Sequence, residues 1–119
     1  MKKITTVFLL ASLLFATGCG SSSSTPEEVA EMFAMAMAEH DWETAKKVST
    51  KETHQMIETM KQFAAAGASP REIVCENMNC EVDGNRTVCT YQVNGNTENL
   101  MLVKENDLWL VEEKKEMDI

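Results

Sequence analysis

Two histidines and one tyrosine–glutamate pair are the residues of this sequence that could support acid–base chemistry. His40 falls between two expected helices and His54 falls one turn into a third, so both are interpreted as solvent-exposed or helix-capping residues. Tyr91 and Glu98 are expected to be neighbours on adjacent strands, where a carboxylate beside a buried hydroxyl can transfer protons, although a structural hydrogen bond is the simpler interpretation. The sequence contains no Gly-Xaa-Ser-Xaa-Gly turn, no phosphate-binding glycine loop and no His-Glu-Xaa-Xaa-His motif. We therefore predict no catalytic residue and no enzyme activity.

Methionine residues are candidate ligands for a soft metal, because thioethers suit Cu(I). Met32, Met35 and Met37 are close together in the sequence, but in a helix Met37 would lie about 200° around the axis from Met35. Methionine is also a common filler of irregular cores. The methionines are therefore expected to pack, and we predict neither a copper site nor a cofactor.

Three cysteines in the second half of the chain are the other candidate metal ligands. Cys75 and Cys80 are separated by four residues, Cys89 follows later, and this spacing matches no zinc pattern. In an extended strand, residues five positions apart point to opposite faces. Cys75 and Cys80 would therefore not converge on one ion, and we predict no zinc site.

The chain is acidic, with a formal net charge of −8. Such a protein repels the phosphate backbone of nucleic acids and the anionic headgroups of membranes. We therefore expect no nucleic-acid partner, and membrane contact should come through an attached lipid. The length of 119 residues, 44% of them hydrophobic and 25% charged, is typical of one globular domain.

The amino terminus has the layout of an export signal. Lys2 and Lys3 form a short basic segment, residues 4–15 are mostly apolar, and small residues follow. The apolar run is too short to span a bilayer, which needs about 20 residues. The sequence Ala-Thr-Gly-Cys that ends at Cys19 resembles the lipobox of bacterial lipoproteins, in which the cysteine is acylated and becomes the first residue of the mature protein.

This resemblance implies a signal peptide over residues 1–18 and a lipid anchor on Cys19. Gly20 stands where family members retained in the inner membrane carry an aspartate, so the resemblance implies sorting to the outer membrane, with the domain facing the periplasm. Residues 19–24 would then be the lipidated cysteine and a flexible serine-rich tether. Residues 25–119 are expected to form the folded domain.

Three helices are expected between residues 25 and 67. The first begins at Thr25, with proline at the first helical position and a capping box to Glu28, and runs to about residue 38. Asp41 can cap a short second helix. The third is expected to begin near Ser49, with a second capping box to Glu52, and to end at a glycine at position 67.

From about residue 72 the apolar pattern alternates, which predicts four strands at 72–82, 87–93, 97–104 and 108–113. Two-residue turns such as Asn94-Gly95 fix the register of the hairpins. This register collects on one face of the sheet the side chains of Val74, Met78, Cys80, Val82, Cys89, Tyr91, Val93, Leu100, Leu102, Trp109 and Val111. The pattern predicts an α+β domain in which three helices cover the apolar face of a four-stranded antiparallel meander.

The same register places Cys80 directly opposite Cys89, at a separation that a disulfide accepts. Export past the inner membrane would bring the pair to a compartment where disulfides persist. Cys75 lies about 16 Å from Cys80 along the strand, at about 3.3 Å per residue. We predict a Cys80–Cys89 disulfide, with Cys75 left as a buried free thiol.

Three short segments of the domain resemble one superfamily. They are residues 25–29 (Thr-Pro-Glu-Glu-Val), residues 41–47 (Asp-Trp-Glu-Thr-Ala-Lys-Lys) and residues 102–105 (Leu-Val-Lys-Glu), the last followed by Trp109. Together they resemble small lipoproteins of the nuclear transport factor 2-like, or cystatin-like, superfamily, many of which have no assigned activity. The resemblance covers residues 25–112 and implies a curved sheet that wraps around the first helix and encloses a cone. Enzymatic members are longer and place an extra hairpin between the helices, so the cone of this chain is expected to be shallow or filled.

On these grounds we predict a non-catalytic binding module in the cell envelope, which holds a small apolar ligand in the cone or docks a protein partner. Trp42, Tyr91 and Trp109 are the aromatic residues expected to line a pocket. The alternatives are a cyclase- or isomerase-type enzyme of the same superfamily and a periplasmic protein that handles metals or redox chemistry.

A second candidate surface is the outer face of the last hairpin. Met101, Val103, Leu108 and Leu110 are expected to project there, opposite the core, with Val88 nearby. An exposed apolar cluster of this size indicates contact with a second copy or with an envelope protein, unless the tail of the chain covers it.

Overall fold

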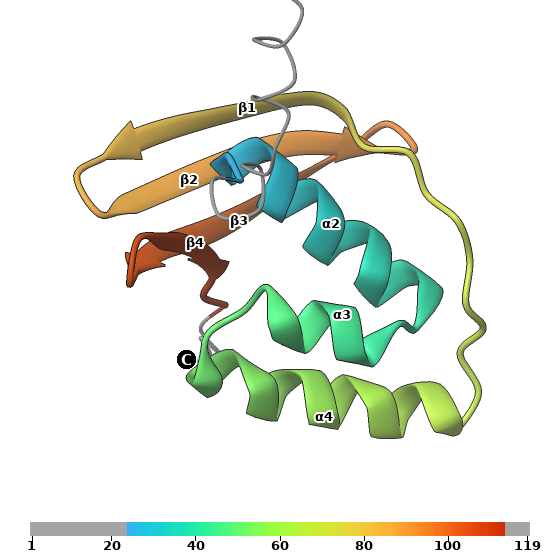
Figure 1. The fold of residues 1–119 in the computed structure, drawn as a ribbon. Coiled ribbons are helices and arrows are strands. Elements are labelled where there is room, and N and C mark those ends of the chain that lie inside the picture. Colours follow the sequence, from blue (N-terminus) through green and yellow to red (C-terminus); the bar gives the residue numbers. More distant parts are fainter. Residues whose placement is uncertain (1–23, 114–119) are drawn as a thin grey trace, which may run out of the picture.

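The computed structural model describes residues 24–113, which form helices and strands in the order α2 to α4 and then β1 to β4 (Figure 1). The predicted signal peptide, Cys19 and the tail after residue 113 lie outside the described residues. The elements are α2 (Pro26–Glu39), α3 (Trp42–Lys47), α4 (Lys51–Ala65), β1 (Glu76–Asp83), β2 (Arg86–Val93), β3 (Asn96–Glu105) and β4 (Leu108–Val111). Within these residues no helix has the length and apolar character needed to cross a bilayer.

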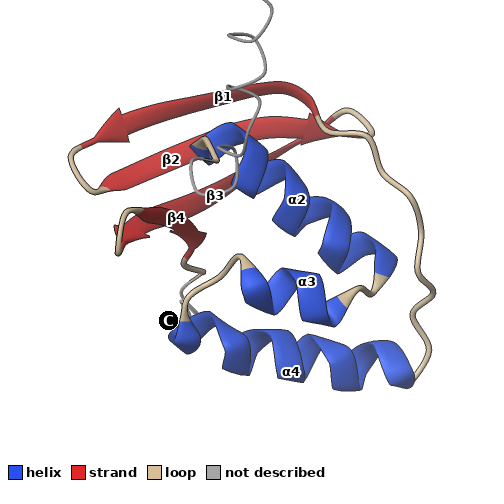
Figure 2. Cartoon of the chain, in the orientation of Figure 1, coloured by secondary structure: helices blue, strands red, loops and turns tan. Residues whose placement is uncertain are grey.

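The α+β architecture with helices first and an antiparallel meander second is confirmed (Figure 2). The strand order is β1-β2-β3-β4, and every neighbouring pair is antiparallel. α2 lies across one face of the sheet and contacts all four strands, while α3 and α4 continue away from it (Figure 1). The core lies between α2 and this inner face, where Phe33 and Leu102 are buried.

The predicted capping box at the start of α2 is present. The Glu28 N–H donates to Thr25 Oγ1 and the Thr25 N–H donates to Glu28 Oε1, each over 3.2 Å. These bonds satisfy two donors that a helix terminus otherwise leaves unpaired. They fix where α2 begins.

The start of α4 differs from the prediction by one residue. Thr50, and not Ser49, is the N-cap, and its Oγ1 accepts the N–H of Thr53. Ser49 instead forms an isolated parallel bridge with Val111. In this bridge the Val111 N–H donates to Val48 O over 2.8 Å, and the Thr50 N–H donates to Val111 O over 3.0 Å. The predicted cap at Ser49 is wrong: the Ser49 hydroxyl turns back to α3 and donates to Ala45 O over 2.8 Å, and Thr50 caps the helix instead.

All three hairpin registers are confirmed. Asp83 pairs with Arg86, Val93 with Asn96, and Glu105 with Leu108. At the second turn Asn94 and Gly95 have φ angles of 53° and 82°, the left-handed values that a type I′ turn requires.

The predicted beginning of the first strand is wrong. β1 starts at Glu76, and its register with β2 shifts between Glu76 and Asn79, where Asn77 has a φ of 58°. Such a bulge inserts one extra residue, so side chains before it change face. Val74, expected on the inner face, is therefore 69% exposed, while Ile73 and Cys75 pack against the core.

Val82 was also expected on the inner face, and it is 57% exposed. It is close to the turn of the first hairpin, at the end of β1. Its register with Thr87 is as predicted, so its exposure comes from a lack of covering side chains and not from a slip of the strand.

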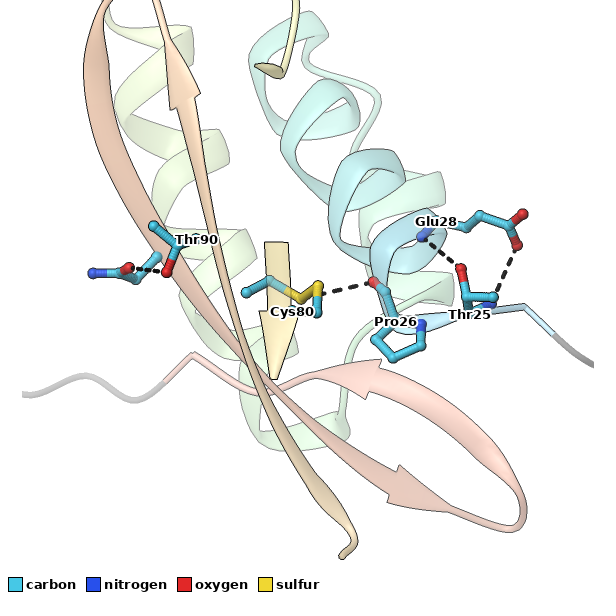
Figure 3. Close-up of a disulfide and its surroundings, with 7 residues drawn as sticks. Thr25, Pro26, Glu28, Cys80 and Thr90 are labelled. Carbon is cyan, nitrogen blue, oxygen red and sulfur yellow. Dashed lines mark hydrogen bonds between the residues drawn. A yellow bond between two sulfur atoms is a disulfide. The ribbon is translucent and has the colours of Figure 1, made fainter. Parts of the chain in front are cut away.

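A disulfide joins Cys80 and Cys89, as predicted, and their Cα atoms are 4.0 Å apart. Figure 3 shows that the bridge lies on the side of the sheet that faces the start of α2. Cys89 Sγ lies 3.9 Å from Pro26 O. Cys75 is a half-buried free thiol, and burial followed by the charge of Glu31 raises its pKa above the ordinary value.

Candidate functional site

A cleft of about 530 Å³ lies between α2, α4 and the inner face of the sheet. This volume is within the range of about 300–1,000 Å³ that small-molecule sites occupy. Most of the lining is apolar: Phe33, Met37, Trp42, Met56, Met60, Phe63, Ile73 and Val93. The space between α2, α4 and the sheet is therefore open, beside the packed core that lies between α2 and the sheet.

The cleft exists because α4 packs closely at only one of its ends. In its first half Thr53 and Ile57 are fully buried, whereas in its second half Met60 is 43% and Phe63 is 67% exposed. The carboxyl end of the helix is therefore not covered as its amino-terminal end is. The side chains that a core would cover there line the cleft instead.

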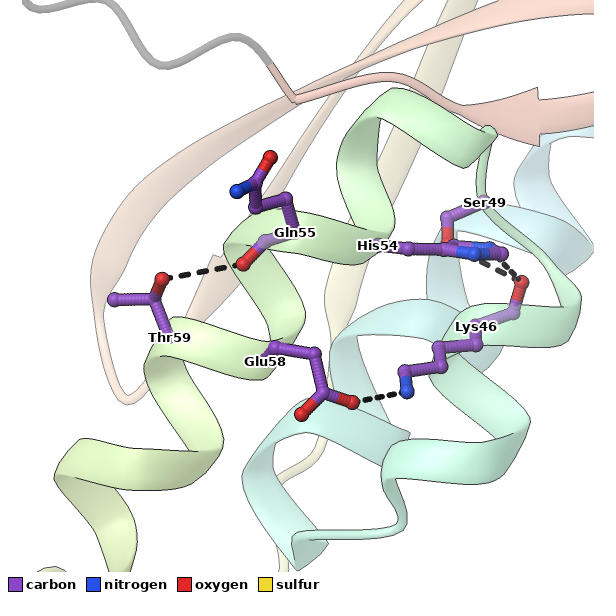
Figure 4. A network of polar contacts seen from close by, with 6 residues as sticks. All are labelled: Lys46, Ser49, His54, Gln55, Glu58 and Thr59. Carbon is purple, nitrogen blue, oxygen red and sulfur yellow. Dashed lines mark hydrogen bonds and ion pairs between the residues drawn. The ribbon is translucent and has the colours of Figure 1, made fainter.

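Bonds to β4 and α3 hold the amino-terminal end of α4. Thr53 Oγ1 donates to Val111 O over 3.3 Å and accepts the Glu113 N–H over 3.1 Å. His54 Nε2 donates to Lys46 O over 2.9 Å, and Lys46 pairs with Glu58 (Figure 4). These contacts account for His54 as a structural residue that joins α3 to α4.

His40 and Trp42 form a stacked pair at the carboxyl end of α2. His40 is the C-cap of the helix with a φ of 64°, and its ring lies 4.9 Å from that of Trp42 at an interplanar angle of 21°. Both residues line the cleft. The sequence indicated that His40 could cap the helix. It did not show that His40 lines the cleft, because that depends on the left-handed backbone angle that brings the ring back to Trp42.

Tyr91 and Glu98 are opposite each other on β2 and β3, and both line the cleft. Burial has the largest effect on Tyr91 and, together with charges from Cys75, Glu98 and Glu113, raises the pKa of its phenol to about 12. The phenol is therefore protonated at neutral pH and can donate a hydrogen bond to a ligand. It cannot serve as a general base there, because that role requires a pKa near the operating pH.

Residues 66–75, which we call the connector, close the cleft at the ends of α2 and α4. The connector runs without regular secondary structure from α4 to β1 (Figure 1). Ala68, Arg71 and Ile73 line the cleft, and the Arg71 N–H donates to Ala38 O over 2.9 Å. Ile73 lies in this irregular segment, ahead of the bulge at Asn77, so strand alternation did not reveal its place in the cleft.

Trp109 lies away from this cleft, although we expected it beside Trp42 and Tyr91. It pairs with Lys104 across the last hairpin, and the Lys104 ammonium lies 5.3 Å from the centre of its ring. The cleft lining includes Trp42 and Tyr91 but not Trp109.

The outer face of the last hairpin carries the apolar residues expected there. Val88 pairs with Met101, and Val103 pairs with Leu110. Leu108 is 43% and Val88 is 50% exposed, while Met101, Val103 and Leu110 are half-buried. The register therefore places an apolar patch on the side of the sheet opposite α2.

No group of three or more histidine, cysteine, aspartate or glutamate side chains within residues 24–113 could hold a metal ion. Three methionines, Met37, Met56 and Met60, do line the cleft together with His40. Only Met37 belongs to the sequence cluster considered above. The other two come from α4, where a spacing of four residues places them on one side of the helix.

No protein-family model and no curated protein matches this chain. Among solved structures, the chain is similar to a crystal structure from Campylobacter jejuni described as a candidate NTF2-like transpeptidase. The two share 21% identity with a TM-score of 0.55, over 76% of this chain and 100% of that one. Similarity at this identity shows the fold alone, which is a nuclear transport factor 2-like fold.

Proposed function

We propose that this protein is a non-catalytic binding module that holds a small apolar ligand in the cleft between α2, α4 and the sheet. The observation that carries the proposal is the open cleft of about 530 Å³ with a mostly apolar lining. Aromatic and methionine side chains supply contact area, and a few polar groups can fix the orientation of a ligand.

The chemistry of the lining supports binding over catalysis. Its ionisable side chains are His40, Arg71, Tyr91, Glu98 and Glu113. Transpeptidation, which the name of the Campylobacter structure mentions, is an acyl transfer and needs an activated nucleophile. No serine, threonine or cysteine is present in the described lining of the cleft, and the Tyr91 phenol stays protonated at neutral pH.

The proposal predicts saturable binding of a neutral apolar dye such as N-phenyl-naphthylamine. The chain from Gly20 to Ile119 is suitable, because it lacks both the proposed apolar signal peptide and the lipidated cysteine and therefore needs no detergent. Ala64→Phe places a large side chain on the cleft side of α4, whereas Ala65→Phe adds the same group at a neighbouring exposed position outside the lining. Dye binding should be lost in Ala64→Phe and retained in Ala65→Phe. Equal binding by both variants, or no saturable binding by the parent, would overturn the proposal.

We also propose that the module is a lipoprotein of the outer membrane, anchored through Cys19. The order of basic, apolar and small residues before Cys19 supports this location, and the Cys80–Cys89 disulfide is compatible with an oxidising compartment. Cells that produce the full chain should incorporate a fatty-acid probe into it, and Cys19→Ala should abolish the label. Labelled Cys19→Ala, or wild-type protein released in soluble form, would disprove the anchor.

Cu(I) binding is a second candidate function, favoured by the three thioethers and one imidazole that line the same cleft. The double substitution Met56→Leu with Met60→Leu should abolish Cu(I) binding in competition with bicinchoninate while preserving dye binding. Cu(I) affinity that is the same in the parent and the double variant would rule out this site.

A further inference from the structure

Negative charge in the cleft is concentrated around Tyr91. Glu98 is directly opposite Tyr91 on the neighbouring strand, and opposed residues in an antiparallel pair have Cβ atoms about 4.5–5.5 Å apart. Glu113 also lines the cleft, where its backbone N–H bonds to Thr53. Burial and the charge of Cys75, and after them the two carboxylates, raise the pKa of Tyr91.

The cationic group of the lining belongs to a different element. Arg71 lies on the connector, which is held by its backbone bond to Ala38 near the end of α2. The sheet side of the cleft is thus acidic, in a chain whose formal net charge is already −8. A ligand with an anionic group would be repelled on the sheet side and a ligand with a cationic group would be attracted there.

The apolar walls suit a flexible chain better than a rigid ring. Met37 on α2 and Met56 and Met60 on α4 are unbranched side chains with several rotatable bonds, which can adapt to an aliphatic chain in more than one conformation. Phe63 extends this apolar surface to the rim, where it is 67% exposed. The ring of Tyr91 lies where the apolar walls meet the acidic sheet side.

We propose that the cleft binds single-chain aliphatic amines, with the chain between the methionines of α2 and α4 and the ammonium group beside Tyr91 and Glu98. The inference rests on the proposed binding function and specifies its ligand class. An ammonium at this position gains the charge of Glu98, and the Tyr91 hydroxyl oxygen can accept one of its N–H groups. The methylene groups gain the apolar lining.

Three ligands with the same chain length and different head groups test this proposal: decylamine, decanol and decanoate. Each is used to displace the naphthylamine dye at neutral pH from the chain that spans Gly20 to Ile119. Decylamine should bind about two- to fivefold more tightly than decanol, the range expected for a partly exposed ion pair, and decanoate should bind most weakly. Added salt should narrow these differences. Each methylene removed from the amine should weaken binding by up to about fourfold.

Glu98→Gln should remove the preference for decylamine and leave decanol binding unchanged. Glu105→Gln is the matched control, because it makes the same change on the same strand at an exposed position outside the cleft lining. Decanol that binds as tightly as decylamine, or decanoate that binds best, would overturn the amine preference and leave the binding function standing. Failure of all three ligands and of the dye would overturn the binding function itself.

Discussion

Cys80 and Cys89 face each other across the first hairpin, and their disulfide lies against the first residue of α2. The bridge spans a sequence separation of 9, and closing so short a loop should stabilise the domain by about 2.5–3 kcal/mol through chain entropy. Replacing both cysteines by serine should lower the free energy of unfolding by this amount in urea denaturation.

Cys75→Ser is the control for this change, because Cys75 is free and should shift the free energy of unfolding by less than about 1 kcal/mol. Peptide mapping of the oxidised protein without reductant provides an independent check. A crosslink that contains Cys75, or a double variant as stable as the parent, would contradict the predicted bridge.

Asn77 sets the orientation of the segment that precedes β1. Its φ of 58° lies in the left-handed region, where a β-branched residue is strained by about 1–2 kcal/mol. Asn77→Val should therefore have a free energy of unfolding lower than that of Asn77→Gly by about 1–2 kcal/mol. Both variants lose the 2.8 Å hydrogen bond from Asn77 Nδ2 to Gln92 Oε1, so the difference between them isolates the backbone effect.

Asn79→Val is a further control, because Asn79 is exposed beyond the bulge and pairs regularly with Thr90. It should be close to neutral. If Asn77→Val were as stable as Asn77→Gly, Asn77 would not hold a left-handed backbone conformation in solution, and the bulge would be absent.

The parts of the fold that the sequence predicted are those decided by local chemistry. The capping box of Thr25 and Glu28 involves residues three positions apart, and the turn at Asn94 and Gly95 needs only two residues that accept a positive φ. Once the turns were placed, alternation alone determined that Cys80 faces Cys89.

The parts that could not be predicted depend on contacts between distant segments or on one backbone angle. The bulge arises because Asn77 takes a left-handed φ, which asparagine tolerates but does not require. The cleft depends on the bridge between Ser49 and Val111, which holds α4 at its amino end. Periodicity could place Met60 and Phe63 on one side of a helix, but it could not show that the carboxyl half of this helix leaves them uncovered.

The outer face of the last hairpin is expected to mediate self-association. Leu108 and Val88 are exposed there beside Met101, Val103 and Leu110, and a contiguous apolar patch of this kind is usually covered by a partner. We expect the chain from Gly20 to Ile119 to form a dimer in light scattering, and Val103→Lys to convert it to a monomer.

Thr97→Lys is the control for this test, because it adds the same charge on the same face of β3 away from the patch. A monomeric parent whose stability is unchanged by Val103→Lys would remove the interface. A monomeric parent that Val103→Lys destabilises would show instead that the chain covers the patch with its own tail.

Tyr91 allows a direct test of the electrostatics of the cleft, because it is the single tyrosine of the chain. Burial first, and then the charges of Cys75, Glu98 and Glu113, raise its pKa to about 12 in the folded protein, whereas an unfolded chain should show the ordinary value of about 10. The absorbance of tyrosinate against pH should report the higher value in buffer and the lower one in denaturant. Glu98→Gln should lower the folded value, because it removes one of the negative charges.

This shift also makes a prediction for stability. Since the folded state holds the proton more tightly, the stabilisation linked to Tyr91 is fully present below about pH 10 and is lost as the pH rises through about 12. Tyr91→Phe has no proton to lose, so its free energy of unfolding should fall less steeply than that of the parent over the same interval. A folded protein whose tyrosinate appears near pH 10, or a parent and a phenylalanine variant with parallel pH profiles, would show that Tyr91 is not held in the buried, acidic surroundings that the proposed amine site requires.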